Sequence, residues 1–434
     1  MDDGASDGSR RSSLESHDPW PDLERLCALG GRLCGTPGEA EARAFLTGRL
    51  QEIAESHGGQ VLSVPHDYLG WRARDCRIEA QSSGQTFEGY PLLHSPSTAP
   101  GGLNCEVLDL GRGTDADIAA HSAEIAGRIV LTRHEFMFSP EHIHRNRKYM
   151  NAVAHGAAGF LIAGGADQVG MVGGGVGFGD ADTPIPAAGI SAETATALAG
   201  GADGPSRARL TIAADTAPAH TETLVYERAG ETPEWIVISA HLDGHGLAQS
   251  AIDNATGVAA AISAASDIAA HAPTLTRGLR LCLFSIEEWG LLGSRDYLAG
   301  LGREACEAIS LNVNLDSVAG AAGLAALYSE FPALADFLRD VADEADTSLA
   351  LHEPLVRNSD HYNFAAAGIP ACRLMAGFEM PKSNLRHVLT AEDTIDKVSP
   401  EQLRLAAALT AQIVMRACTA PELDLRAGRR EPAS

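Results

Sequence analysis

The sequence predicts an α/β protein with a mixed, mainly parallel sheet, helices on both faces of it, and a small β-rich insert. From residue 218 to 418, apolar strand candidates alternate with helix candidates, an order typical of parallel sheets. Between residues 80 and 217, short strand-like runs with many glycines replace the long helices. We therefore predict a main domain made of residues 19–79 and 218–423, with an insert at residues 80–217 between its two parts. Residues 1–18 and 424–434 are predicted to be disordered ends.

The first elements along the chain are two helices. They start near DPWPDLERLCAL and GTPGEAEARAFLTGRLQEIAESHG. In the second helix, Thr36 as N-cap, Pro37 next and Glu39 as the reciprocal partner indicate a capping box, and Gly58-Gly59 ends the helix.

The insert contains a strand candidate, GRIVLTRH, and a helix candidate that runs into another strand, NRKYMNAVAHGAAGFLIAGG. The main domain then continues with four apolar runs, which we predict to be strands at residues 234–240, 279–286, 308–315 and 370–375. Helices are predicted between and after them, at residues 254–271, 331–346 and 399–418. Ser399 and Gln402 indicate a second capping box at the start of the last helix.

Composition excludes several classes of function. A net charge of −24 argues against a nucleic-acid surface and against binding to an anionic membrane. The polar N-terminus lacks the apolar stretch of a signal peptide, and no apolar run has the length of a membrane span. The eight cysteines are scattered without CxxC spacing, as expected for reduced, buried residues. We expect a cytoplasmic enzyme.

Metal-ligating side chains follow the predicted strands. In folds of this class, ligands bind beyond the carboxyl ends of the strands. An isolated Asp253 is typical of an N-cap, an Asp after a strand is typical of a turn, and Glu287-Glu288 could be an exposed helix start favoured by the helix dipole. Four successive strand ends with such residues instead favour a site for one or two divalent metals, preferably zinc. The residues are His241, Asp243, Asp253, Glu287, Glu288, Asp316 and His387.

These residues also carry a family resemblance. SAHLDGH, AIDNATG, FSIEEWGLLGS, NLDS and RHVLTAEDT resemble, in order and spacing, the M28 family of zinc aminopeptidases and carboxypeptidases. The two insert segments quoted above resemble a protease-associated (PA) domain. The resemblance implies a phosphorylase/hydrolase-like fold of the zinc exopeptidases with two Zn²⁺ per chain. It places His241 and Asp316 on one zinc, Glu288 and His387 on the other, and Asp253 between them. Asp243 would orient His241, and Glu287 would be the general base.

One position departs from the family pattern. Many members have Tyr directly before the last histidine, where its hydroxyl helps to hold the oxyanion, and this chain has Arg386. Either Arg386 or Tyr362 performs this task, or Arg386 binds a substrate carboxylate. Arg357 and Lys382 are further candidates for binding that carboxylate.

We therefore predict a di-zinc exopeptidase that acts on a short peptide or amino-acid amide, with an aminopeptidase or dipeptidase favoured. A carboxypeptidase, or an amidohydrolase acting on N-acyl amino acids, stays open as an alternative. A glutaminyl-cyclase-like acyltransferase would need only one zinc, and a non-catalytic binding module would lack the ligands. We expect the PA-like insert to cover the site and to restrict it to short peptides. A homodimer is compatible with the composition.

Overall fold

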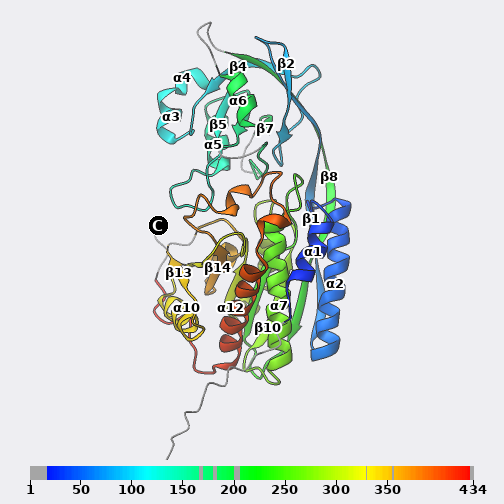
Figure 1. Ribbon diagram of the computed structural model, residues 1–434, viewed down its shortest axis with the longest axis vertical. Helices are drawn as coiled ribbons and strands as arrows, with labels where there is room; N and C mark the ends of the chain where they lie inside the picture. Colours follow the sequence, from blue (N-terminus) through cyan, green and yellow to red (C-terminus); the bar gives the residue numbers. More distant parts are fainter. Residues whose placement is uncertain are drawn as a thin grey trace, which may run out of the picture.

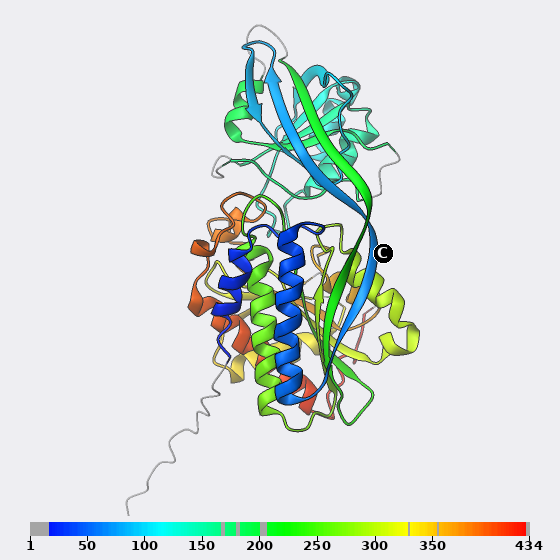
Figure 2. The same cartoon turned by 90° about the vertical axis from the view of Figure 1, so that its right-hand side faces the viewer.

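Two lobes joined by a pair of long strands form the protein. The computed structural model describes residues 17–165, 170–178, 183–199, 206–328, 330–353 and 356–430. Strands β1 (Gln60–Ala80) and β8 (Arg207–Arg228) pair antiparallel and run from the lower lobe into the upper one (Figure 2). The predicted boundary at residue 80 coincides with the upper end of β1, whereas the one at residue 217 falls within β8, where Ala217 pairs with Gly70. Most of the two chain ends predicted to be disordered, residues 1–16 and 431–434, lies outside the described residues.

The lower lobe contains the predicted mixed, mainly parallel sheet. Its order is β13-β12-β14-β11-β9-β10-β8. The four central strands run parallel, while β12 is antiparallel to β14 and β8 is antiparallel to β10. The four predicted strands are present as β9 (Trp235–His241), β10 (Gly278–Phe284), β11 (Ile309–Leu315) and β14 (Ala371–Ala376). Strands β12 (Leu324–Tyr328) and β13 (Leu349–His352) were not predicted.

Helices cover both faces of this sheet, which explains why its strands are apolar throughout. Ile236 and Ile238 of β9 pack into the core cluster with α7 (Thr256–His271) and α12 (Pro400–Thr419). Val237, between them, packs on the other face with α8 (Leu292–Leu301) and α11 (His361–Ala366). Helix α10 (Pro332–Glu344) lies beside β13, and the short α9 (Arg303–Glu307) precedes β11 (Figure 1).

The N-terminal helices form as predicted, but neither capping box is complete. Helix α1 spans Trp20–Ala28 and α2 spans Pro37–His57. The hydroxyl of Thr36 accepts the Glu39 N–H at 3.4 Å, yet the Glu39 carboxylate bonds to Arg43 and Thr221. At α12 the side chain of Gln402 accepts from Gly320 instead of returning to its own N-cap. The predicted reciprocal bonds are wrong because tertiary contacts use the two side chains.

The upper lobe is built on β3 (Tyr90–Pro91), β4 (Leu103–Asp109), β5 (Ile129–Arg133), β6 (Gly159–Ala163) and β7 (Ala187–Ile190). Strand β2 (Gln85–Glu88) pairs with the upper end of β1. The helices are α3 (Asp115–Ala120), α4 (Ser122–Ile125), α5 (Arg145–Ala154) and α6 (Ala192–Leu198). The helix-into-strand prediction corresponds to α5 followed by β6. This lobe lies above the lower one (Figure 1).

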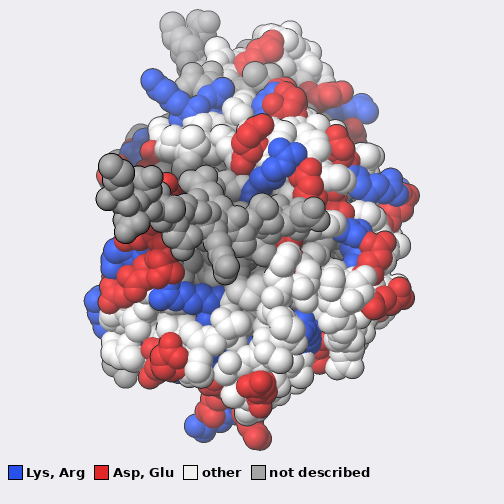
Figure 3. Space-filling view, turned by 60° about the horizontal axis from the view of Figure 1, so that its bottom comes forward, with Lys and Arg blue, Asp and Glu red and all other residues white. Residues whose placement is uncertain are grey.

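Charged side chains of both signs are interspersed on the face drawn in Figure 3. Part of the predicted C-terminal tail is bound to the lower lobe, since Arg426 donates to the Glu307 carbonyl at 3.0 Å and Arg430 pairs with Glu353. None of the described helices is long and apolar enough to cross a membrane.

Candidate metal centre

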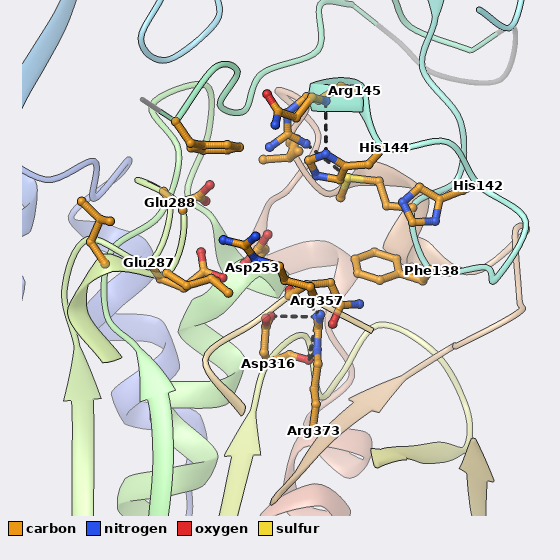
Figure 4. Close-up of a pocket in the computed structure, with 18 of the residues that line it drawn as sticks. Phe138, His142, His144, Arg145, Asp253, Glu287, Glu288, Asp316, Arg357 and Arg373 are labelled. Atoms are coloured by element: carbon orange, nitrogen blue, oxygen red, sulfur yellow. Dashed lines mark hydrogen bonds and ion pairs between the residues drawn. The ribbon is translucent and has the colours of Figure 1, made fainter. Parts of the chain in front are cut away.

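A cavity of about 280 Å³ opens between the two lobes. Its lower wall includes Asp253, Glu287 and Asp316, which follow the carboxyl ends of β9, β10 and β11, as the topology predicts. The upper wall comes from the inserted lobe, including Phe138, His142, His144 and Arg145 (Figure 4). The cavity is therefore closed on one side by the insert.

Three of the predicted ligands meet at this edge of the sheet. Nε2 of His241 lies 3.1 Å from a carboxylate oxygen of Asp253 and 3.7 Å from one of Asp316. One donor atom from each residue lies within 4.8 Å of the other two, the only such group of three His, Cys, Asp or Glu side chains among the described residues. An imidazole and two carboxylates are a ligand set suited to a divalent metal such as zinc.

The backbone orients His241 for this role. Nδ1 of its ring lies 3.1 Å from the Asp243 carbonyl, which can only accept, so Nδ1 carries the hydrogen and Nε2 presents its lone pair to the cluster. Burial alone would lower the pKa of His241, but Glu287 and the neighbouring aspartates outweigh it and raise this pKa well above its usual range. The centre therefore favours positive charge, as a cation site should.

Asp243 lies beside the ring of His241 and also holds the backbone that follows β10. The carboxylate oxygens accept the backbone N–H groups of Glu287 and Glu288, each at 3.2 Å, while its Oδ1 lies 3.7 Å from Nδ1 of His241. Asp243 thus fixes the start of the EEWG segment after β10. Ile286, just before it, has φ +52°, a backbone conformation that is strained for a β-branched residue.

Both glutamates of that segment line the cavity and are buried. Burial, together with the nearby charge of Asp253, raises the pKa of Glu288 to about 7. Burial also raises the pKa of Glu287 well above its usual range. Oε1 of Glu288 is buried without a hydrogen-bond partner among the described residues.

Asp316 follows β11 and is held by an arginine that the sequence analysis missed. Arg373, in β14, lies 3.1 Å from Oδ1 of Asp316 and also donates to its carbonyl (Figure 4). Burial would raise the pKa of Asp316, but Arg373 and His241 keep it below its usual range. Arg373 could have been noticed in the sequence, because it is a charged residue inside the apolar run PACRLM.

Asp253 lies in the turn η1 (Ala251–Ala255) before α7. Asp393, another residue not predicted for the site, accepts the N–H groups of Ile252 at 2.7 Å and Asp253 at 3.2 Å. The carboxylate of Asp393 thus positions the backbone of a ligand from 140 residues away in sequence.

The structure does not bring His387 to the other ligands. His387 ends the short helix η2 (Asn384–His387), and among the described residues Leu389 lines the cavity where the last ligand was expected. Arg386 donates to the Lys382 carbonyl at 2.8 Å, and neither it nor Tyr362 belongs to the described cavity wall. Arg357 does line the cavity and lies over the Tyr362 ring, 5.3 Å from its centroid.

Comparison with known proteins gives the family. Residues 223–414 match peptidase family M28, and residues 90–198 match the PA domain. The chain contains an M28 peptidase domain and a PA domain. It is therefore a peptide hydrolase, and every predicted site residue lies in the M28 match.

Relatives of this M28 peptidase cover most of the chain. The probable lipoprotein aminopeptidase LpqL of Mycobacterium tuberculosis is 27% identical over 377 residues, which are 82% of this chain and 71% of LpqL. Aminopeptidase YwaD of Bacillus subtilis is 24% identical and covers 95% of this chain and 87% of its own length. Among solved structures, a peptidase M28 precursor from Shewanella amazonensis has a TM-score of 0.78 at 22% identity, covering 97% and 96% of the two chains. A zinc aminopeptidase from Bacillus subtilis has a TM-score of 0.75 at 21% identity and covers 95% and 97%. These structures share the fold of the M28 peptidase.

Proposed function

We propose that this M28 peptidase is a zinc-dependent aminopeptidase that releases the N-terminal residue of short peptides. The observation that carries the proposal is the cluster of His241, Asp253 and Asp316 beside the buried Glu287. Relatives named as aminopeptidases support the direction of cleavage.

In this proposal, His241, Asp253 and Asp316 hold the zinc. When bound, the metal polarises the scissile carbonyl and lowers the pKa of water. Glu287 then accepts a proton from the attacking water and passes it to the leaving amine. Its raised pKa suits this task, because a base must also act as an acid in the second step. The inserted lobe excludes bulk water and long chains from the cavity.

A dipeptidase is the second candidate, favoured by one feature of the rim. Arg357 is exposed at the cavity and forms no ion pair with the described residues. Its guanidinium could bind the free carboxylate of a dipeptide in a bidentate manner.

The test combines metal analysis with a substrate panel of free-amino anilides, unblocked dipeptides and N-blocked dipeptides. We expect free-amino substrates to be cleaved, and Glu287→Gln to lower kcat about 10²- to 10⁴-fold with unchanged zinc content. Glu304→Gln, an exposed carboxylate on α9, is the matched control. Preference for N-blocked substrates would favour a carboxypeptidase or amidohydrolase. Cyclisation of an N-terminal glutamine would favour the acyltransferase.

A further inference from the structure

We propose that the cavity holds one divalent cation, at His241, Asp253 and Asp316. In place of a second cation, Arg145 of the inserted lobe supplies positive charge to the cavity. The inference rests on the proposed function, since it concerns the same centre. It departs from the two zinc ions that the M28 resemblance implies. Three features of the described residues support this inference: the residues of the cavity wall, the buried position of Arg145 and the balance of charge around the cavity.

The cavity wall lacks the imidazole that a second site needs. Leu389 is held in place by the inserted lobe, because its carbonyl accepts the Gly173 N–H at 2.7 Å and the next residue, Thr390, forms a bridge with Val172. Thr390 also folds back on His387 and donates to its carbonyl through both its N–H and its hydroxyl. These bonds fix the register in which Leu389, with φ +64°, faces the cavity.

Without that imidazole, the second site retains only Glu288 and a shared oxygen of Asp253. Zinc sites in proteins normally have at least three protein ligands. The neighbours that act electrostatically on His387 are Arg386, Lys397, Glu392 and Asp393, and none of these lines the described cavity wall. Two carboxylates alone therefore make a weak site.

The side chain of Arg145 is buried and held in place by the inserted lobe. Arg145 begins α5, is only 7% exposed, and donates from Nε to the Gly175 carbonyl at 2.9 Å. Gly174, with φ +100°, lies beneath the guanidinium, and a Cβ atom there would lie 2.2 Å from the guanidinium carbon, so a larger residue would displace the side chain of Arg145. Among the described residues no carboxylate pairs directly with Arg145. The carboxylates of Glu288, Asp253 and Glu287 attract it across the cavity (Figure 4).

The balance of charge also favours one cation. Four carboxylates line the cavity, and two buried arginines, Arg145 and Arg373, offset two of these charges. Among the residues that line the cavity, one divalent cation offsets the other two charges, whereas a second cation would bring excess positive charge to this wall. The remaining cavity arginines, Arg295 and Arg357, are exposed at the rim, where water screens them.

Equilibrium dialysis of the full chain against a range of free zinc, followed by elemental analysis, tests the inference. We expect binding to saturate at one zinc per chain, unchanged in His387→Ala and abolished in Asp316→Ala. Saturation at two, with one lost in His387→Ala, would overturn the inference and leave the proposed function intact. No zinc at any concentration would overturn the proposed function as well.

A gain of binding provides a second, independent test. The double variant Arg145→Met, Leu389→His removes the cation and restores an imidazole, and we expect it to bind a second zinc. If it folds, by circular dichroism, and still binds one, the account of ligands and charge is wrong. Arg357→Met with Leu389→His is the matched control, because it removes an exposed arginine and should gain less.

Discussion

Arg32 should be a principal support of the metal centre, although it lies on the loop between the first two helices. Its side chain is fully buried. The guanidinium donates to the carbonyls of Leu242 at 3.1 Å, Gln249 at 2.7 Å and Ser250 at 2.9 Å. These carbonyls lie at both ends of the loop that joins His241 to Asp253.

Replacing Arg32 by Met keeps most of the volume and removes all three bonds. Each bond from a charged donor contributes about 1.5–3 kcal/mol, and two buried carbonyls and one partly buried carbonyl would lose their partner. Removing a buried cation offsets part of this loss, since burial lowers the pKa of Arg32 and thus opposes its charge. We expect the free energy of unfolding to fall by about 3–5 kcal/mol.

Urea unfolding followed by tryptophan fluorescence measures this change, and calorimetric titration measures zinc affinity. Arg32→Lys should recover only part of the loss, because an ammonium cannot reach three carbonyls in a fork. Arg72→Met removes an exposed arginine of β1 and should change the stability by less than about 0.5 kcal/mol. If Arg32→Met costs less than about 1 kcal/mol and leaves zinc affinity unchanged, the loop does not depend on this residue.

Three further changes test other parts of the structure. Asp393→Asn places an amide against the N–H groups of the Asp253 turn, so zinc affinity measured by calorimetry should fall about 10- to 100-fold. Gly293→Ala puts a Cβ 2.0 Å from the Ser285 carbonyl and should cost about 1–3 kcal/mol in urea, whereas Gly300→Ala, in the same helix with open space, should stabilise by about 0.5–1 kcal/mol. Burial lowers the pKa of His94 from 6.5 to about 4, so the unfolded chain binds the extra proton and stability falls as pH drops through that window. His94 should contribute about 3 kcal/mol of this loss, and the pH slope should be shallower in His94→Asn; an unchanged slope in that variant would contradict this explanation.

The strands and their ligands could be predicted because local sequence determines both. Strands buried on two faces appear as continuous apolar runs, and a side chain directly after such a run must lie at the edge of the sheet. His241 and Asp316 were found in this way. Strands β12 and β13 were missed because LAALY and LALH are short and contain no β-branched residue.

The residues that support the site could not be predicted in the same way. Arg32, Arg145 and Asp393 act on groups that are far away in sequence, and nothing in their local sequence distinguishes them from surface charges. The capping boxes fail for a related reason. The motif that predicts a local bond for Glu39 does not show that Thr221, 182 residues away, provides a competing partner in the folded chain.

His387 and Leu389 show a limit of predicting metal ligands from the spacing of a sequence motif. A histidine in RHVLTAEDT satisfies the motif, but a loop residue faces a cavity only if backbone bonds set its register. Here those bonds come from Val172 and Gly173 in the inserted lobe, more than 200 residues earlier in the chain. The same lobe also contributes Arg145. The insert thus does more than cover the centre. Its bonds place Leu389 instead of His387 at the cavity wall, and its Arg145 adds a positive charge there. We therefore expect metal stoichiometry among M28 peptidases with a PA domain to depend on this interface as well as on the ligand motif.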